Sequence, residues 1–200
     1  AAYASISQRQ ENMPVLAAGK RHVRQQVMVQ TLRTNEFWAL NEKLQAAGVR
    51  PLVVKGIVCR DLYPRPGHRQ SSDEDVLIPA EQFALCHRVM TDFGMQTTQT
   101  DLTDAYEIPY RKAGSPLYIE LHKSLFPPKD AAYGDMNRFF AGVFDRAVAE
   151  EIQGNTVYTM APTDHLFYLI CHAFKHFLHS GFGIRQVCDI ILYANAYGSR

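Results

Sequence analysis

The short apolar run Asp75–Ile78, closed by Pro79, constrains the fold of this chain more than any other segment. A branched apolar run of this length that ends at a proline predicts a buried strand. The run Leu52–Val54, which follows Pro51, has the same character. Because segments with a helical pattern surround both strands, the sequence predicts an α/β or α+β fold.

Helix formers fill residues 15–47, and breaks near Gly19 and Thr34 predict two or more helices there, with Gly48 as a C-cap. Further helices are expected at 56–63, 80–93, about 136–143, 162–179 and 184–193, with two strands between 95 and 122 and another at 156–159. This order predicts an N-terminal helical segment (1–50), a core with a mixed sheet (51–160) and a C-terminal helical annex (161–200).

The charge balance gives no sign of a polyanionic partner. The chain has 21 Lys and Arg against 20 Asp and Glu, for a net charge of +1. Neither a nucleic acid nor an anionic membrane is therefore expected as a partner, and the basic run Lys20–Arg24 is interpreted as a solvated helix face. The four cysteines form no C-x-x-C pair, no apolar run has the length of a membrane span, and residues 1–10 lack the order of a signal peptide. A cytoplasmic location is expected.

Several carboxylates have a spacing that brings them together. Side chains two apart on a strand share a face, so Asp73 and Asp75 project together. The same alternation puts Glu120 and His122 on one face of a strand over residues 117–122. If the two strands are neighbours, three carboxylates converge, and such a cluster favours Mg²⁺ or Mn²⁺ as a neutralising cation. Taken alone, Asp73-Glu74-Asp75 would indicate only an acidic turn, because such tripeptides are common.

The chain resembles the uncharacterised nucleotidyltransferase family of the DNA polymerase beta superfamily. The pieces that carry the resemblance are Val54-Lys55-Gly56, Leu62-Tyr63-Pro64, Arg69, Ser72-Asp73-Glu74-Asp75-Val76-Leu77-Ile78, Glu120-Leu121-His122 and the helix from Pro162 through His172 and His176. They span about 49–189, which is most of the chain. The resemblance implies a polymerase-beta-type nucleotidyltransferase core.

The resemblance also implies roles for individual residues. Asp73, Asp75 and Glu120 would be catalytic metal ligands, with Glu120 able to accept the acceptor's proton. Nucleotide binding would involve Lys55, Gly56, Arg69 and Ser72. A glycine lets backbone N–H groups approach phosphate, while arginine and lysine suit its charge.

This sequence departs from the family pattern in four places. The turn is Lys55-Gly56-Ile57 rather than Gly-Ser, and the spacer to Asp73 is longer than usual. Glu74 stands where relatives have an apolar residue, so it is expected either to pair with a cation or to be exposed. Relatives usually continue well beyond Tyr197, so either a truncated annex or a short family member is expected.

A histidine-rich helix supplies further candidate residues. His172, Lys175, His176 and His179 lie three and four apart, hence on one helix face. This face is interpreted either as a substrate or phosphate contact or as a polar cap over packed phenylalanines; a zinc site is a weaker third reading. His122 is likewise interpreted as orienting Glu120, contacting substrate or forming a structural hydrogen bond.

The leading hypothesis is an Mg²⁺-dependent transfer of a nucleoside monophosphate from an NTP, expected to be ATP, to an acceptor hydroxyl, with release of pyrophosphate. The acceptor would be a small molecule or a protein. The first alternative is a non-catalytic nucleotide- or partner-binding module with the same fold. A second alternative is a zinc-dependent hydrolase that uses the histidine face.

Overall fold

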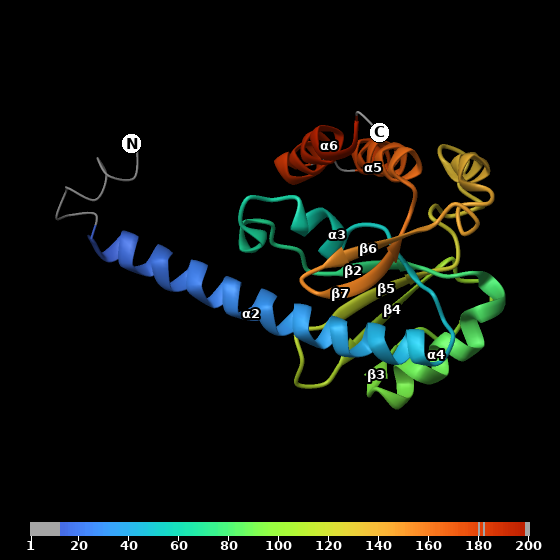
Figure 1. Ribbon diagram of the computed structural model, residues 1–200, viewed down its shortest axis with the longest axis horizontal. Coiled ribbons are helices and arrows are strands. Elements are labelled where there is room, and N and C mark those ends of the chain that lie inside the picture. Colours follow the sequence, from blue (N-terminus) through green and yellow to red (C-terminus); the bar gives the residue numbers. More distant parts are fainter. Residues whose placement is uncertain (1–12, 180, 182, 199–200) are drawn as a thin grey trace.

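A mixed sheet lies at the centre of the computed structural model, which describes residues 13–179, 181 and 183–198 (Figure 1). Within these residues the sheet has seven strands in the order β3-β4-β5-β2-β1-β7-β6. They are β1 (Leu52–Val53), β2 (Glu74–Leu77), β3 (Met95–Gln96), β4 (Glu107–Lys112), β5 (Tyr118–His122), β6 (Val148–Ile152) and β7 (Asn155–Thr159). Strand β2 pairs in parallel with β5 and β1 in parallel with β7, while the other neighbours are antiparallel. The predicted mixed α/β fold is confirmed.

Helices cover both faces of the sheet. They are α2 (Met13–Ala46), α3 (Gly56–Asp61), α4 (Phe83–Asp92), α5 (Pro162–His179) and α6 (Ile184–Tyr197), with short 3-10 helices at Pro66–His68, Ala80–Gln82 and Gly134–Phe140. Figure 1 shows α2 and α4 on one side of the sheet and α5 and α6 on the other.

Strand alternation divides the apolar core into two clusters, one on each face of the sheet. Val76 belongs to the cluster that contains Leu40 of α2 and Met90 of α4. Its neighbour Leu77 belongs to the cluster that contains Tyr168 of α5 and Tyr193 of α6. Asp75, two residues before Leu77, therefore faces α5 and α6. None of the helices within the described residues is long and apolar enough to cross a membrane.

Helix α2 corrects the expectation of two or more N-terminal helices, because it is continuous from Met13 to Ala46. A single glycine in a helix costs only about 1 kcal/mol, so Gly19 does not end it. Thr34 is buried and its Oγ1 accepts a hydrogen bond from Arg60, which holds this residue in the helix by a tertiary contact. Figure 1 shows the N-terminal part of α2 extending away from the sheet.

Two other differences concern strands. The region between 95 and 122 contains three strands rather than two, because the very short β3 joins the expected pair. Strand β6 was not predicted, since its sequence Val-Ala-Glu-Glu-Ile has little apolar periodicity and it lies at the edge of the sheet. Helix α6 extends to Tyr197, beyond the expected Tyr193.

Candidate functional site: an acidic cavity beneath helix α5

The register of β2 and β5 brings the predicted carboxylates together. Asp75 lies directly opposite Glu120 in the parallel pair. Asp75, Glu120 and His122 each offer one ligand atom, and these atoms all lie within 4.8 Å of one another. Asp73 lines the same cavity, which has a volume of about 290 Å³ and lies between the sheet and helices α5 and α6. The predicted approach of Asp75 to Glu120 is therefore observed, whereas Asp73, which precedes β2, lines the cavity outside this close group.

Lys55 neutralises Asp75. Its Nζ lies 2.7 Å from Asp75 Oδ1 and 2.9 Å from Nε2 of His172 in α5. Because an ammonium only donates, His172 accepts this bond through Nε2. Burial, with Lys55 beside it, holds the pKa of His172 well below its ordinary value. Burial alone would raise the pKa of Asp75, but the attraction of Lys55, followed by that of His122, outweighs burial and lowers it.

Glu120 has the opposite environment. Burial, followed by the negative charges of Asp75, Glu107 and Asp73, raises the pKa of Glu120 to about 8. The repulsion in this group is relieved when a cation binds, and carboxylate oxygens are ligands that Mg²⁺ and Mn²⁺ accept. The donor set therefore fits a divalent cation.

His122 has buried ring nitrogens with no hydrogen-bond partner among the described residues. The nearest carboxylate oxygens are Asp75 Oδ1, 3.5 Å from Nε2, and Glu107 Oε2, 3.6 Å from Nδ1. Buried polar atoms usually have partners. His122 thus lies between two carboxylates, where its ring can orient them or contact a cation or substrate.

Arg69 lines the cavity, but its guanidinium already has partners. It makes two 2.8 Å bonds to the carboxylate of Asp189 in α6 and donates to Gly56 O at 3.2 Å. Tyr63 Oη donates to the same carboxylate at 2.8 Å. Arg185, four residues before Asp189 in α6, donates to the carbonyl oxygen of Gln70.

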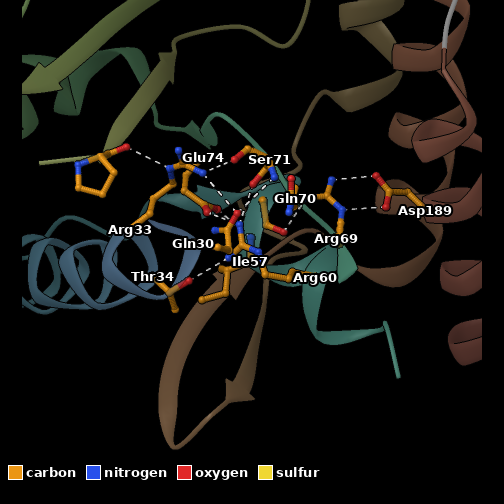
Figure 2. A network of polar contacts seen from close by, with 12 residues as sticks. Gln30, Arg33, Thr34, Ile57, Arg60, Arg69, Gln70, Ser71, Glu74 and Asp189 are labelled. Atoms are coloured by element: carbon orange, nitrogen blue, oxygen red, sulfur yellow. Dashed lines mark hydrogen bonds and ion pairs between the residues drawn. The ribbon is translucent and has the colours of Figure 1, made fainter. Parts of the chain in front are cut away.

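Glu74 is paired with the positively charged side chain of Arg60, which is one of the two outcomes expected for it. Its carboxylate is fully buried and its Oε1 lies 2.6 Å from Nη2 of Arg60 (Figure 2). Its Oε2 accepts a 2.7 Å hydrogen bond from the backbone N–H of Ile57. Gly56 adjoins this contact with φ of 50°, and a Cβ there would lie 1.7 Å from Glu74 Oε2. The close approach of the carboxylate thus requires a glycine.

Ser72 and His179 lie apart from the other candidates. Ser72 is exposed and lines a separate groove with Arg33 and Tyr118, whereas Ser71 lines the cavity. His172, Lys175 and His176 line the cavity, but His179 contacts Tyr133 Oη. The phenylalanines of α5 that were expected to pack beneath this face, Phe167, Phe174 and Phe177, are all exposed.

Sequence reasoning missed several residues of the cavity wall. Glu107 lies opposite His122 in the β4–β5 pair, a relation that only the strand pairing reveals. Arg185 and Asp189 come from α6, and only the tertiary fold reveals their position. Across the described residues, no other His/Cys/Asp/Glu group of three has ligand atoms as close as those of Asp75, Glu120 and His122. The zinc site on α5 therefore gains no support.

The mixed sheet, with Asp75 and Glu120 paired in parallel beneath α5, is the arrangement expected from the resemblance to nucleotidyltransferases. Comparison with protein families agrees: residues 1–200 match the model of a family described as uncharacterised nucleotidyltransferase. The chain belongs to this family. No curated protein sequence matches the chain.

Solved structures with a similar fold are also nucleotidyltransferases. The antibiotic-resistance factor ANT(2'')-Ia has a TM-score of 0.55 at 13% identity, covering 84% of this chain and 86% of that chain. Lincomycin-bound LnuA, a lincosamide antibiotic adenylyltransferase, has a TM-score of 0.53 at 12% identity, covering 80% and 94%. An antigenic nucleotidyltransferase-like protein from Paracoccidioides brasiliensis has a TM-score of 0.51 at 13% identity, covering 84% and 76%. The polymerase-beta-like fold expected from the sequence is confirmed.

Proposed function

We propose that this protein transfers a nucleoside monophosphate from an NTP, expected to be ATP, to a hydroxyl of a small-molecule or protein acceptor, with release of pyrophosphate. The observation that carries the proposal is the parallel pairing of Asp75 with Glu120 in a cavity that Asp73 also lines. Similar folds support it, since one is described as a lincosamide antibiotic adenylyltransferase and another is bound to adenylyl-2''-tobramycin. We also propose that the protein is located in the cytoplasm. The free thiols of all four cysteines support this location.

Asp73, Asp75 and Glu120 would hold the divalent cation, Mg²⁺ or Mn²⁺, with His122 beside them. When bound, the cation neutralises the phosphate oxygens and favours attack at the α-phosphorus.

The protein's own residues supply positioning and charge. Lys55, Lys175 and Arg185 line the cavity and give it a positive side for the triphosphate, and Arg69 supports the Gly56 backbone below it. The acceptor oxygen forms a bond to the α-phosphorus while the bond to the bridging oxygen breaks and pyrophosphate leaves. The acceptor's proton passes to the carboxylate of Glu120, which lines the cavity beside Asp75. Most of the rate enhancement then comes from positioning and electrostatics.

The test is Mg²⁺-dependent pyrophosphate release from NTPs across a panel of hydroxyl acceptors. Asp73→Asn and Asp75→Asn should each lower the rate by on the order of 100-fold or more, because each removes a charge that the cation needs. Asp61→Asn, at an exposed position of α3, is the matched control and should leave the rate unchanged. Undiminished turnover in the Asp73 and Asp75 variants would contradict the proposal.

A specific contact also favours the second candidate, a non-catalytic nucleotide-binding module. The ammonium of Lys55 already neutralises Asp75 at 2.7 Å. Calorimetry of ATP binding with and without Mg²⁺ separates the two functions. Binding that requires Mg²⁺ supports the transferase, whereas binding that ignores Mg²⁺, with no pyrophosphate release, supports the module.

A further inference from the structure

We propose that the buried pair Glu74–Arg60 is a positioning pair for the cation site. In this view it holds the Lys55-Gly56 turn at a fixed distance from Asp73 and Asp75. The inference rests on the proposed function, since it concerns the site at which the cation would bind.

Glu74 joins the two chain segments that carry the site. It lies between Asp73 and Asp75 in sequence, yet strand alternation points it to the opposite face of β2. There its Oε2 accepts the N–H of Ile57 at 2.7 Å, directly after Lys55 and Gly56. One carboxylate therefore links the turn to the strand that carries both aspartates.

Arg60 fixes the segment that leads into β2. Its Nη2 bonds Glu74 Oε1 at 2.6 Å and donates to Ser71 Oγ at 2.8 Å, while its Nη1 donates to Thr34 Oγ1 of α2 at 3.3 Å. Gln30 of α2 also accepts the Ser71 N–H at 3.3 Å. Figure 2 shows these side chains converging between α2 and β2, so the path into Asp73 is tied to a helix on the far side of the sheet.

The Lys55-Gly56 turn and the Glu74 carboxylate are in direct contact. A Cβ at Gly56 would lie 1.7 Å from Glu74 Oε2, so the turn rests directly on this oxygen. The adjacent Lys55 in turn contacts Asp75 at 2.7 Å. A shift of the turn therefore changes the charge arrangement of the cavity, and errors of about 1 Å can cost on the order of 100-fold in rate.

Stability alone does not account for the pair. Replacing a buried ion pair by apolar residues of similar volume is often neutral or stabilising. An apolar residue at position 74 would, however, leave the Ile57 N–H without its acceptor and release the turn. An apolar pair can therefore fill the space of the ion pair in the core, but it cannot accept the Ile57 N–H and so cannot hold the turn.

The experiment compares single and double variants in the full chain. Glu74→Leu leaves Arg60 buried without its partner and should lower the unfolding temperature by on the order of 10 °C. The double variant Arg60→Met/Glu74→Leu should recover most of that loss. Mn²⁺ affinity, measured by the electron paramagnetic resonance signal of free Mn²⁺, should nevertheless stay on the order of 10-fold weaker than in the wild type.

Two further variants make the result specific. Lys112→Met/Glu36→Leu removes a half-buried ion pair between β4 and α2 and should leave Mn²⁺ affinity unchanged. Glu74→Gln keeps an acceptor for the Ile57 N–H and should retain more Mn²⁺ affinity than the double variant. If a stable double variant binds Mn²⁺ as tightly as the wild type, this inference is overturned while the proposed function stands. If the double variant does not fold, the same result in Glu74→Leu overturns it. Absence of Mn²⁺ binding by the wild type would overturn the proposed function together with it.

Discussion

Three consecutive acidic residues at positions 73–75 have three different environments. Asp75 faces α5 and is paired with Lys55, whereas Glu74 faces the other side of the sheet and is paired with Arg60. Asp73 precedes the strand and also lines the cavity. Strand alternation separates Glu74 from the two aspartates, and the ion pair with Lys55 distinguishes Asp75 from Asp73.

Gly56→Ala tests the close approach at the turn. The added Cβ would meet Glu74 Oε2 in a residue with positive φ, so we expect it to disrupt the ion pair and destabilise the fold by about 3 kcal/mol or more. Gly154→Ala is the matched control, because it also has positive φ but nothing within 4 Å, and should cost only about 1–2 kcal/mol. Urea unfolding of both variants measures the difference. Equal losses would show that Glu74 does not press on the turn.

Among the helices, α6 contributes more to the site than its position near the end of the sequence suggests. Asp189 accepts hydrogen bonds from Arg69 and Tyr63, and Arg69 reaches the carbonyl of Gly56. Burial alone would lower the pKa of Arg69, but its hydrogen bonding to Asp189 outweighs burial and raises the pKa. The guanidinium therefore stays charged. The buried Arg69–Asp189 ion pair thus connects α6 to the Lys55-Gly56 turn at the cavity.

Asp189→Asn tests this connection. The substitution leaves the buried Arg69 without a counter-charge, and we expect a loss of about 3–5 kcal/mol in unfolding free energy. Hydrogen exchange in α6 should become faster. Arg185→Gln, which removes only the bond to Gln70 O from a more exposed residue of the same helix, should change the unfolding free energy by about 0.5 kcal/mol or less. A similarly small effect of Asp189→Asn would contradict the connection.

Elements with strong periodicity were predictable, and those held by tertiary contacts were not. The apolar run of β2, the alternation of β5 and the amphipathic α5 were predicted near their observed bounds. Continuity of α2 depends on Arg60 reaching Thr34, and β6 depends on pairing with β7 at the sheet edge. Neither dependence is visible in local sequence.

Across the whole molecule, the site residues also divide into those that local periodicity predicts and those that only tertiary contacts bring together. Alternation predicted that Asp73 and Asp75 would share a face with Glu120, provided that β2 and β5 are neighbours, and they are. It did not predict that Arg69 is paired with Asp189, because residues 120 positions apart have no local relation. Glu107 and Arg185 escaped for the same reason.

The unfolding free energy should depend on pH through His165. This ring is fully buried, its Nε2 lies 2.7 Å from Val54 O, and burial lowers its pKa to about 4. The unfolded chain therefore takes up a proton near pH 6.5 while the folded protein does not. The free energy of unfolding should therefore decrease by roughly 3 kcal/mol as the pH falls from about 6.5 to about 4.

Urea unfolding at a series of pH values measures this slope, and His165→Gln supplies the comparison. Although less stable, the variant should show a flatter dependence between about pH 6.5 and 4, since the titrating ring is gone. An unchanged slope would assign the dependence to other groups.

We propose that Asp73, Asp75 and Glu120 bind a divalent cation that serves nucleotidyl transfer. A crystal structure with Mg²⁺ and a non-hydrolysable ATP analogue is the decisive test. We expect an ion bound by at least two of these carboxylates at about 2.0–2.1 Å and in contact with the triphosphate, with Lys55 turned towards phosphate. A bound nucleotide with Lys55 still on Asp75 and no ion among the three carboxylates would contradict it.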